Sequence, residues 1–269
     1  MTLEEKPKRI RGTRIIAVAN QKGGVGKTTT TINLATALAA IRQKVLIFDI
    51  DPQGNASTGI GIPRKNRERN SYHVLIGEAK IKEATQETEI PGLHIVPSGI
   101  DLSGAEIELV SVERREYCLK ENLREGAGDF DYVLIDCPPA LGLLTINALV
   151  AAQAVLVPLQ CEFFALEGIS QLMNTVKRVK NAFNPGLDIQ GIVLTMHDRR
   201  NNLSELVADD VRDHFGDKVY KTVIPRNVRV SEAPSHGRPV IIYDLNCAGS
   251  KAYLELAGEV IHRERRLSA

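Results

Sequence analysis

The stretch from Ala19 to Thr29, with the sequence ANQKGGVGKTT, constrains the fold of this chain more than any other segment does. An apolar run, Ile15–Val18, precedes it, and a helical pattern from Thr29 to Ala40 follows it. A strand, a glycine-rich loop and a helix in this order are the context that a phosphate-binding loop needs. The glycines let consecutive backbone N–H groups point into one cavity, and the helix N-terminus favours an anion. The alternative, a chance glycine turn, is disfavoured because the pattern fixes several residue types at once.

The side chains of this loop have separate expected tasks. Lys27 is expected to reach the β- and γ-phosphates of a nucleotide, and the Thr28 hydroxyl to complete a Mg²⁺ shell. The remaining positions expected to bind the nucleotide are Gly23, Gly24, Val25, Gly26 and Thr29. The loop departs from the common pattern G-x-x-x-x-G-K-[ST], because Gln21 stands at its first glycine and a second lysine, Lys22, follows.

Short apolar strands alternate with helical patterns along the rest of the chain. Strands are expected at Ile15–Asn20, Val45–Asp49, Leu93–Pro97, Tyr132–Asp136, Val155–Leu159 and Ile189–Met196. Helices are expected at Thr29–Ile41, Leu143–Val150, Leu166–Phe183, Leu203–Phe215 and Ser250–Arg263. This alternation predicts an α/β fold, with a mostly parallel twisted sheet that carries helices on both faces. One domain over residues 13–269 is expected, after a flexible, charge-rich tail at residues 1–12.

Carboxylates follow two of the predicted strands, at the edge of the sheet where ligands bind. Asp49 and Asp51 stand two positions apart, so an extended strand projects them to the same face. One of them can support the Mg²⁺ shell while the other orients the attacking water, and the spacing does not separate these roles. Asp136 ends the apolar run from Tyr132 in the form of a Walker B strand, where an acid holds Mg²⁺ directly or through a water. The alternative, an acid that caps the next loop, is weakened by the following Cys137–Pro139, a loop suited to approach a γ-phosphate.

Composition argues against several classes of protein. The formal net charge of +1 argues against an overall polycation, so contact with nucleic acid must come from a local patch. The four cysteines form no C-x-x-C pair, which favours buried reduced thiols over a metal or iron–sulfur site. No apolar run approaches the length of about 18 residues that a spanning helix needs, and the N-terminus lacks the apolar core of a signal peptide. A cytoplasmic protein is therefore expected.

The loop at residues 22–28 resembles the deviant Walker A loop of the ParA/MinD family of dimerising ATPases. Within that family the chain resembles the chromosome-partitioning ParA (Soj) branch, from about Arg14 to Val260. The resemblance implies a P-loop NTPase fold and a Mg²⁺-dependent ATPase with ATP and Mg²⁺ as cofactors. It also implies a homodimer when ATP is bound, a ParB-type centromere-binding partner that stimulates hydrolysis, and a role in chromosome or plasmid segregation.

The resemblance assigns roles to individual residues. It implies that Lys22 reaches across the dimer to the partner's nucleotide, so that Lys22, Lys27 and Asp51 carry the catalysis. Asp51 would orient the attacking water, whereas Asp49 would lie on the Mg²⁺ side with Thr28 and Asp136.

The segment from Ile224 to Gly237, rich in proline and polar residues, is expected to form a structured loop rather than a core element. The resemblance places it beside the adenine, with Pro225 and Asn227 as the residues nearest the base. A capped surface turn is an equal alternative for Asn227.

Arginines supply the expected contacts with DNA. The resemblance matches Arg200 and Arg229 to arginines that form a patch for non-specific double-stranded DNA in the dimer, which implies association with the nucleoid. Solvated surface arginines are the alternative. Contacts of this kind go to phosphates, so binding would tolerate any sequence and would weaken with salt. The basic segment Pro63–Asn70 is expected to be an exposed loop, with DNA contact as a lesser alternative.

A membrane-cycling switch of the MinD type is the competing function. It would need a C-terminal amphipathic helix that inserts into a membrane surface. The final segment, Tyr253–Leu267, has apolar spacing, but it lacks bulky Phe or Trp residues and two acids interrupt its apolar stripe. It is therefore expected to pack on the domain, with no contact to a membrane.

Overall fold

The computed structural model describes residues 12–198 and 200–267. Its strands are β1 (Arg14–Val18), β2 (Val45–Asp49), β3 (Gln86–Glu87), β4 (Leu93–Val96), β5 (Tyr132–Asp136), β6 (Ala154–Gln160), β7 (Asp188–His197) and β8 (Val219–Pro225). Its helices are α1 (Lys27–Ala40), α2 (Asn55–Gly59), α3 (Ser71–Leu75), α4 (Ile81–Ala84), α5 (Leu102–Glu108), α6 (Cys118–Gly126), α7 (Leu143–Ala151), α8 (Ala165–Ala182), α9 (Asn202–Phe215), α10 (Val228–Glu232), α11 (Val240–Tyr243) and α12 (Ala248–Leu267).

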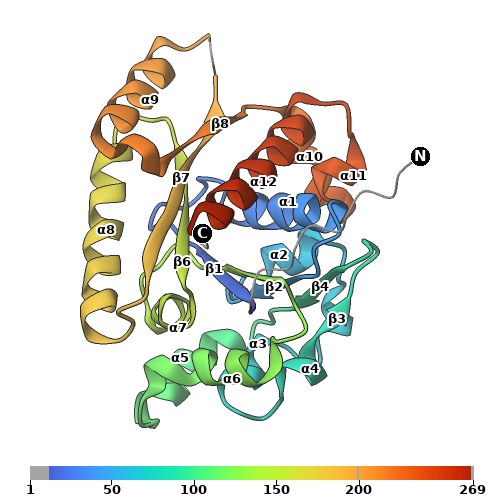
Figure 1. Ribbon diagram of the computed structural model, residues 1–269. Coiled ribbons are helices and arrows are strands. Elements are labelled where there is room, and N and C mark those ends of the chain that lie inside the picture. Colours follow the sequence, from blue (N-terminus) through green and yellow to red (C-terminus); the bar gives the residue numbers. More distant parts are fainter. Residues whose placement is uncertain (1–11, 199, 268–269) are drawn as a thin grey trace.

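The strands form one sheet in the order β3-β4-β2-β5-β1-β6-β7-β8 (Figure 1). β3 runs antiparallel to β4, and the other neighbouring strands are parallel. β1 and β5 lie at the centre, where Val18 pairs with Asp136, and Asp136 pairs in turn with Asp49 of β2. The ends of β1, β2 and β5 therefore meet at one edge of the sheet.

Helices cover both faces of this sheet and produce two hydrophobic cores. The helices α1, α2, α11 and α12 pack on one face, whereas α5, α6, α7, α8 and α9 pack on the other (Figure 1). Successive residues of a strand point to opposite faces, so β5 sends Val133 and Ile135 into one core and Tyr132 and Leu134 into the other. This double burial explains why the central strands are continuous apolar runs, and it confirms the predicted fold class.

Two strands were not expected from the sequence. β3 is very short, and β8 lies at the edge of the sheet, where a single neighbouring strand, β7, flanks it. Lys221 is exposed and Tyr220 is buried, so β8 lacks the continuous apolar run of the central strands. The assignment of Ile224 and Pro225 to a loop was therefore wrong, because they end β8.

The basic segment Pro63–Asn70 is only partly the exposed loop that its composition predicts. Arg64 and Lys65 are exposed, but Arg67 is only 7% exposed and donates hydrogen bonds to surrounding backbone. Asn70 is also buried and caps α3 through its side chain. The prediction was wrong for these two residues, because the composition of the segment does not show their hydrogen-bond partners. The partners of Arg67 include Gly54 and Ser98, and Asn70 accepts the N–H of Tyr72 in α3.

The described residues test the predictions about the two ends of the chain only in part. The expected tail at residues 1–12 lies outside the described residues apart from Gly12, and the single domain at residues 13–269 stays a prediction. Among the described residues no helix is long and apolar enough to cross a membrane. α12 packs against α1 and β8, and its Tyr253, Leu256 and Val260 side chains are buried in the core. This confirms the expectation that the last helix packs on the protein.

We predict that Leu256→Ala lowers the free energy of unfolding by about 2–5 kcal/mol, because it opens a cavity at a fully buried position between α12 and the sheet. Chemical denaturation followed by circular dichroism measures this change. Leu245→Ala is the matched control, since Leu245 is 57% exposed and its loss should change stability by less than about 0.5 kcal/mol. Equal effects of the two substitutions would contradict the packing of α12 described here.

Candidate functional site

The loop between β1 and α1 has the backbone geometry of an anion site. Gly24 and Gly26 have φ values of +75° and +88°, in the left-handed region that favours glycine. Gly26 is the N-cap of α1 and has no side chain that could accept the first N–H groups of the helix. These N–H groups, with the positive end of the helix dipole, suit phosphate oxygens.

Neighbouring strands fix this loop in place. Asn20 donates from Nδ2 to the carbonyl of Pro158 at 2.7 Å, and its Oδ1 accepts the N–H of Lys22 at 3.1 Å. The Thr195 hydroxyl, near the end of β7, donates to the carbonyl of Val25 at 2.8 Å. The loop is therefore held from β6 and β7, independently of any bound nucleotide.

Lys27 lies beneath the loop and is 6% exposed. Its Nζ donates to the carbonyl of Lys22 at 2.9 Å. Burial lowers the pKa of this ammonium, and the carboxylates of Asp136 and Asp51 oppose that shift. The Lys27 ammonium therefore lies inside the loop. Its contact with the β- and γ-phosphates stays a prediction.

Asp136, at the end of β5, accepts two hydroxyl groups of α1. The Thr28 hydroxyl donates to Oδ2 at 2.8 Å, and the Thr31 hydroxyl donates to Oδ1 at 2.9 Å. Burial, together with the neighbouring charge of Asp49, raises the pKa of Asp136. Thr31 was not singled out from the sequence, although it follows Thr28 by three positions on the same helical face.

The donor set at Asp136 fits Mg²⁺. A carboxylate and a hydroxyl oxygen stand together, and a bound cation would offset the negative charge that burial makes costly there. The described residues contain no cluster of three His, Cys, Asp or Glu side chains suited to a metal.

Asp49 and Asp51 have different surroundings. Asp49 is fully buried, and its Oδ2 accepts the N–H and the hydroxyl of Ser57 at 2.8 Å and 2.6 Å. Its Oδ1 accepts the N–H of Asp51 at 3.2 Å, so Asp49 supports the backbone of Asp51. Asp51 is 7% exposed, and its Oδ1 accepts the N–H of Gln53 at 3.0 Å. The Mg²⁺ role of Asp49 and the water-orienting role of Asp51 stay predictions.

Lys22, the second lysine of the loop, forms an ion pair with Glu162, just after β6. The two side chains are 40% and 46% exposed. Glu162 was missed from the sequence, although it follows the carboxyl end of a strand as Asp51 does.

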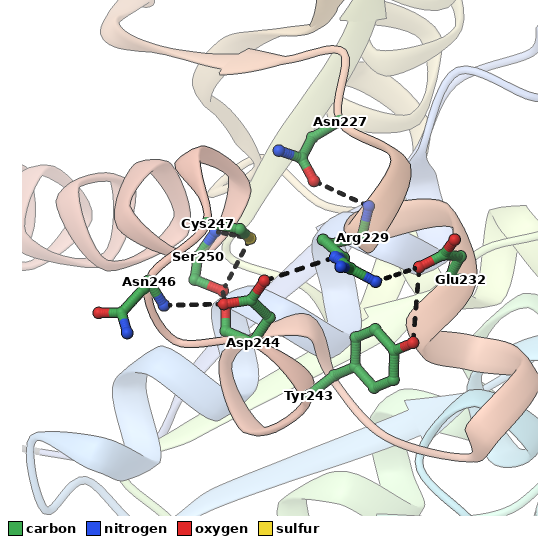
Figure 2. Close-up of polar contacts among 8 residues, drawn as sticks. All are labelled: Asn227, Arg229, Glu232, Tyr243, Asp244, Asn246, Cys247 and Ser250. Carbon is green, nitrogen blue, oxygen red and sulfur yellow. Dashed lines mark hydrogen bonds and ion pairs between the residues drawn. The ribbon is translucent and has the colours of Figure 1, made fainter.

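The expected base-side residues lie on both sides of the end of β8. Pro225 is its last residue, and Asn227 is the N-cap of α10, with its Oδ1 accepting the N–H of Arg229 at 2.9 Å (Figure 2). The capping alternative for Asn227 is thus confirmed, and its Nδ2 still offers donors to a base.

Met196 was missed from the sequence. It has a φ of +50°, and a Cβ added at Gly26 would lie 3.7 Å from its Cε, so it borders the loop.

Both expected DNA-binding arginines have acidic partners. Arg200 donates from Nε and Nη2 to the two carboxylate oxygens of Asp198, each at 3.0 Å, and lowers the pKa of Asp198 to about 2. Arg229 contacts Glu232 at 3.0 Å and Asp244 at 3.6 Å (Figure 2). Arg200 lines a groove of about 850 Å³ together with Pro225, whereas the lining of that groove does not include Arg229.

The four cysteines form no disulfide among the described residues. All four are free, with Cys137 and Cys161 buried and Cys118 and Cys247 half-buried. Burial raises the pKa of the Cys161 thiol to about 11, and it raises that of Cys137 further. The expectation of buried thiols is confirmed for Cys137 and Cys161 and is wrong for Cys118 and Cys247, which are half-buried.

The chain is similar in sequence to proteins of known name. A family model described as an AAA domain matches residues 13–189. The chromosome partitioning protein ParA of Caulobacter vibrioides is 64% identical over 254 residues, which cover 94% of this chain and 95% of that protein. The sporulation initiation inhibitor protein Soj of Bacillus subtilis is 53% identical over 247 residues, which cover 92% and 98%.

Solved structures share the fold. The cobyrinic acid a,c-diamide synthase of Mycobacterium smegmatis, with a bound ATP analogue and magnesium, gives a TM-score of 0.83 at 38% identity and covers 94% of this chain and 96% of that one. The septum site-determining protein MinD of Pyrococcus horikoshii, complexed with Mg-ADP, gives a TM-score of 0.78 at 27% identity, with 96% and 99% covered.

We predict that Lys27→Ala weakens nucleotide binding by at least about tenfold, because a hydrogen bond to a charged group contributes about 1.5–3 kcal/mol and 1.4 kcal/mol is a factor of ten. Titration of the protein with a fluorescent ATP analogue measures the affinity. Lys82→Ala is the control, since this exposed lysine pairs with Asp129 far from the loop in sequence. Wild-type affinity in the Lys27 variant would refute the assignment of the loop.

Proposed function

The chain belongs to the ParA/MinD family of ATPases, and on that basis we propose that it is an ATP-dependent switch for the partitioning of DNA. In this proposal two copies join when ATP binds, and the dimer coats double-stranded DNA without sequence preference. A ParB-type centromere-binding partner then stimulates hydrolysis of ATP to ADP and phosphate, which returns the dimer to monomers. The names of the relatives support a role in chromosome or plasmid segregation.

The observation that carries the proposal is the convergence of four groups at one edge of the sheet: the glycine loop, Lys27, the pair of Thr28 with Asp136, and Asp51. Transfer of a phosphoryl group to water needs placement and charge neutralisation more than covalent chemistry. Lys27 and the loop N–H groups would bind the phosphates, and Asp51 would orient the water. Mg²⁺, held by Thr28 and Asp136, would supply charge neutralisation at the phosphates.

Dimerisation would depend on Lys22. In the described chain this lysine pairs with Glu162, and both side chains are partly exposed, so the pair contributes little to stability. Lys22 can therefore leave Glu162 at low cost and reach the phosphates bound by a partner subunit. A lysine supplied in this way makes nucleotide binding and dimerisation one linked equilibrium.

DNA binding would use Arg200 and Arg229. Their present partners, Asp198, Glu232 and Asp244, occupy the guanidinium groups much as phosphates would. DNA must replace these carboxylates or bind the remaining N–H donors. From the resemblance to ParA proteins we expect the arginines of two subunits to form one continuous patch in the dimer. Each phosphate neutralised contributes about 0.9 to the slope of log affinity against log salt concentration.

The MinD-type alternative receives less support. The structure of the Pyrococcus horikoshii MinD is 27% identical to this chain, whereas the ParA of Caulobacter vibrioides is 64% identical. The apolar side chains of α12 that a membrane surface would need are used in the core. We therefore propose a protein of the cytoplasm and nucleoid without a membrane-bound state.

We predict that Asp51→Ala binds ATP and accumulates as a dimer, because the substitution removes the group that orients water but leaves the phosphate loop intact. Light scattering in saturating ATP and Mg²⁺ should give twice the monomer mass, and phosphate release should fall by at least about a hundredfold. Asp213→Ala, at an exposed position of α9, is the control and should behave as the wild type. A monomeric variant that still hydrolyses ATP would contradict the proposal.

We predict that Arg200→Glu dimerises with ATP but loses affinity for DNA, because the charge reversal repels phosphates. Fluorescence anisotropy with duplex DNA at several salt concentrations should show weaker binding and a slope reduced by about 0.9 for each lost phosphate contact. Arg124→Glu makes the same charge change at an exposed position of α6 and should leave binding near the wild-type value. An equal loss in both variants would remove the specific role of Arg200.

A further inference from the structure

Arg67 is a buried cation in the segment Pro63–Asn70, whose composition predicts an exposed loop. Its guanidinium makes five hydrogen bonds, to the carbonyls of Ile62, Gly54 and Ser98 and to the hydroxyl of Thr58. None of these acceptors is a carboxylate. Burial of a charge is costly without strong partners, so a residue that only filled this space would not need a guanidinium.

Two of the acceptors of Arg67, Gly54 and Ser98, connect it to Asp51. The carbonyl of Asp51 accepts the N–H of Gly54 at 2.8 Å and the hydroxyl of Ser98 at 2.7 Å. Nη1 of Arg67 donates to the carbonyls of these same two residues, each at 3.2 Å. One nitrogen of Arg67 therefore joins both residues that donate to the carbonyl of Asp51.

Gly54 gives independent support for this contact. Its φ of +62° lies in the left-handed region, and a Cβ added there would stand 2.5 Å from Nη1 of Arg67. The turn from Asp51 to Gly54 is thus shaped to admit the guanidinium at close range. The same turn presents the Asp51 carboxylate, whose Oδ1 accepts the N–H of Gln53 within it.

We propose that Arg67 is a positioning residue for Asp51: its planar fork joins Gly54 to Ser98 and so fixes the turn whose carboxylate orients the attacking water. This inference rests on the proposed ATPase role of Asp51. Among the described residues, the hydrogen bonds of Arg67 go to Ile62, Gly54, Ser98 and Thr58 and none goes to the phosphate loop, so we assign its contribution to turnover and not to nucleotide affinity. The distinction separates it from a residue that only stabilises the fold.

The test is steady-state phosphate release by the full chain with MgATP and duplex DNA, for wild type and for Arg67→Ala. We expect kcat to fall by about 10- to 100-fold while KM for ATP stays within about twofold, because a small displacement of a positioning group has an effect of that size. Guanidinium ion at millimolar concentration should restore part of the lost kcat by occupying the vacated site. Arg64→Ala, an exposed arginine of the same segment, is the matched control.

A kcat at the wild-type level in Arg67→Ala, or a loss carried by KM, would overturn the inference. If thermal unfolding shows that the alanine variant does not fold, Arg67→Lys replaces it, since lysine keeps the charge but not the planar fork. A lowered kcat with unchanged KM in that variant supports the inference, and a wild-type kcat overturns it. Asp51→Ala is measured in parallel. If this variant releases phosphate as fast as wild type, the proposed role of Asp51 is wrong. If it is slow while Arg67→Ala keeps the wild-type kcat, only the inference about Arg67 is wrong.

Discussion

Two hydroxyl groups of α1 donate to one buried carboxylate, Asp136, and the arrangement of the site depends on this pair of hydrogen bonds. They join the end of β5 to the start of the helix that follows the glycine loop. The backbone of Asp136 is also paired in the sheet with Val18 of β1 and Asp49 of β2, so strand pairing brings the start of the loop and the end of β2 to the same edge as this carboxylate. Asp136 is buried beside Asp49, and this makes its negative charge costly. A bound Mg²⁺ would offset that cost, and the phosphates of a nucleotide would bring Mg²⁺ to the same position.

A second network extends from Asp49 to the water-orienting candidate. Asp49 accepts the hydroxyl of Ser57, the Ser57 hydroxyl accepts the N–H of Ser98, and the Ser98 hydroxyl donates to the carbonyl of Asp51. Arg67 joins this network by a hydrogen bond from Nη1 to the carbonyl of Ser98. Buried hydrogen-bond chains of this kind strengthen one another and favour one geometry. The position of Asp51 is therefore set by several residues that would not touch a nucleotide.

The sequence predicts what local patterns encode. The glycine spacing identifies Lys27 and Thr28, and the apolar run before Asp136 identifies its strand, because parallel strands bring their carboxyl ends to one edge. Arg67 escapes such prediction, since its partners include backbone carbonyls 13 and 31 positions away, which have no side-chain signature. β8 escapes it because an edge strand with an exposed Lys221 lacks the continuous apolar run of a buried strand.

The cations that the proposed function needs for dimerisation and for DNA binding share one property. Lys22 pairs with Glu162, Arg200 with Asp198, and Arg229 with Glu232 and Asp244. Each pair is at least partly exposed, so its loss has a small free-energy cost in water. A phosphate offers the same cation more negative charge and more acceptor oxygens than a carboxylate does. Both proposed transitions, dimerisation on ATP and attachment to DNA, then become exchanges of carboxylate for phosphate around cations that the monomer already holds in place.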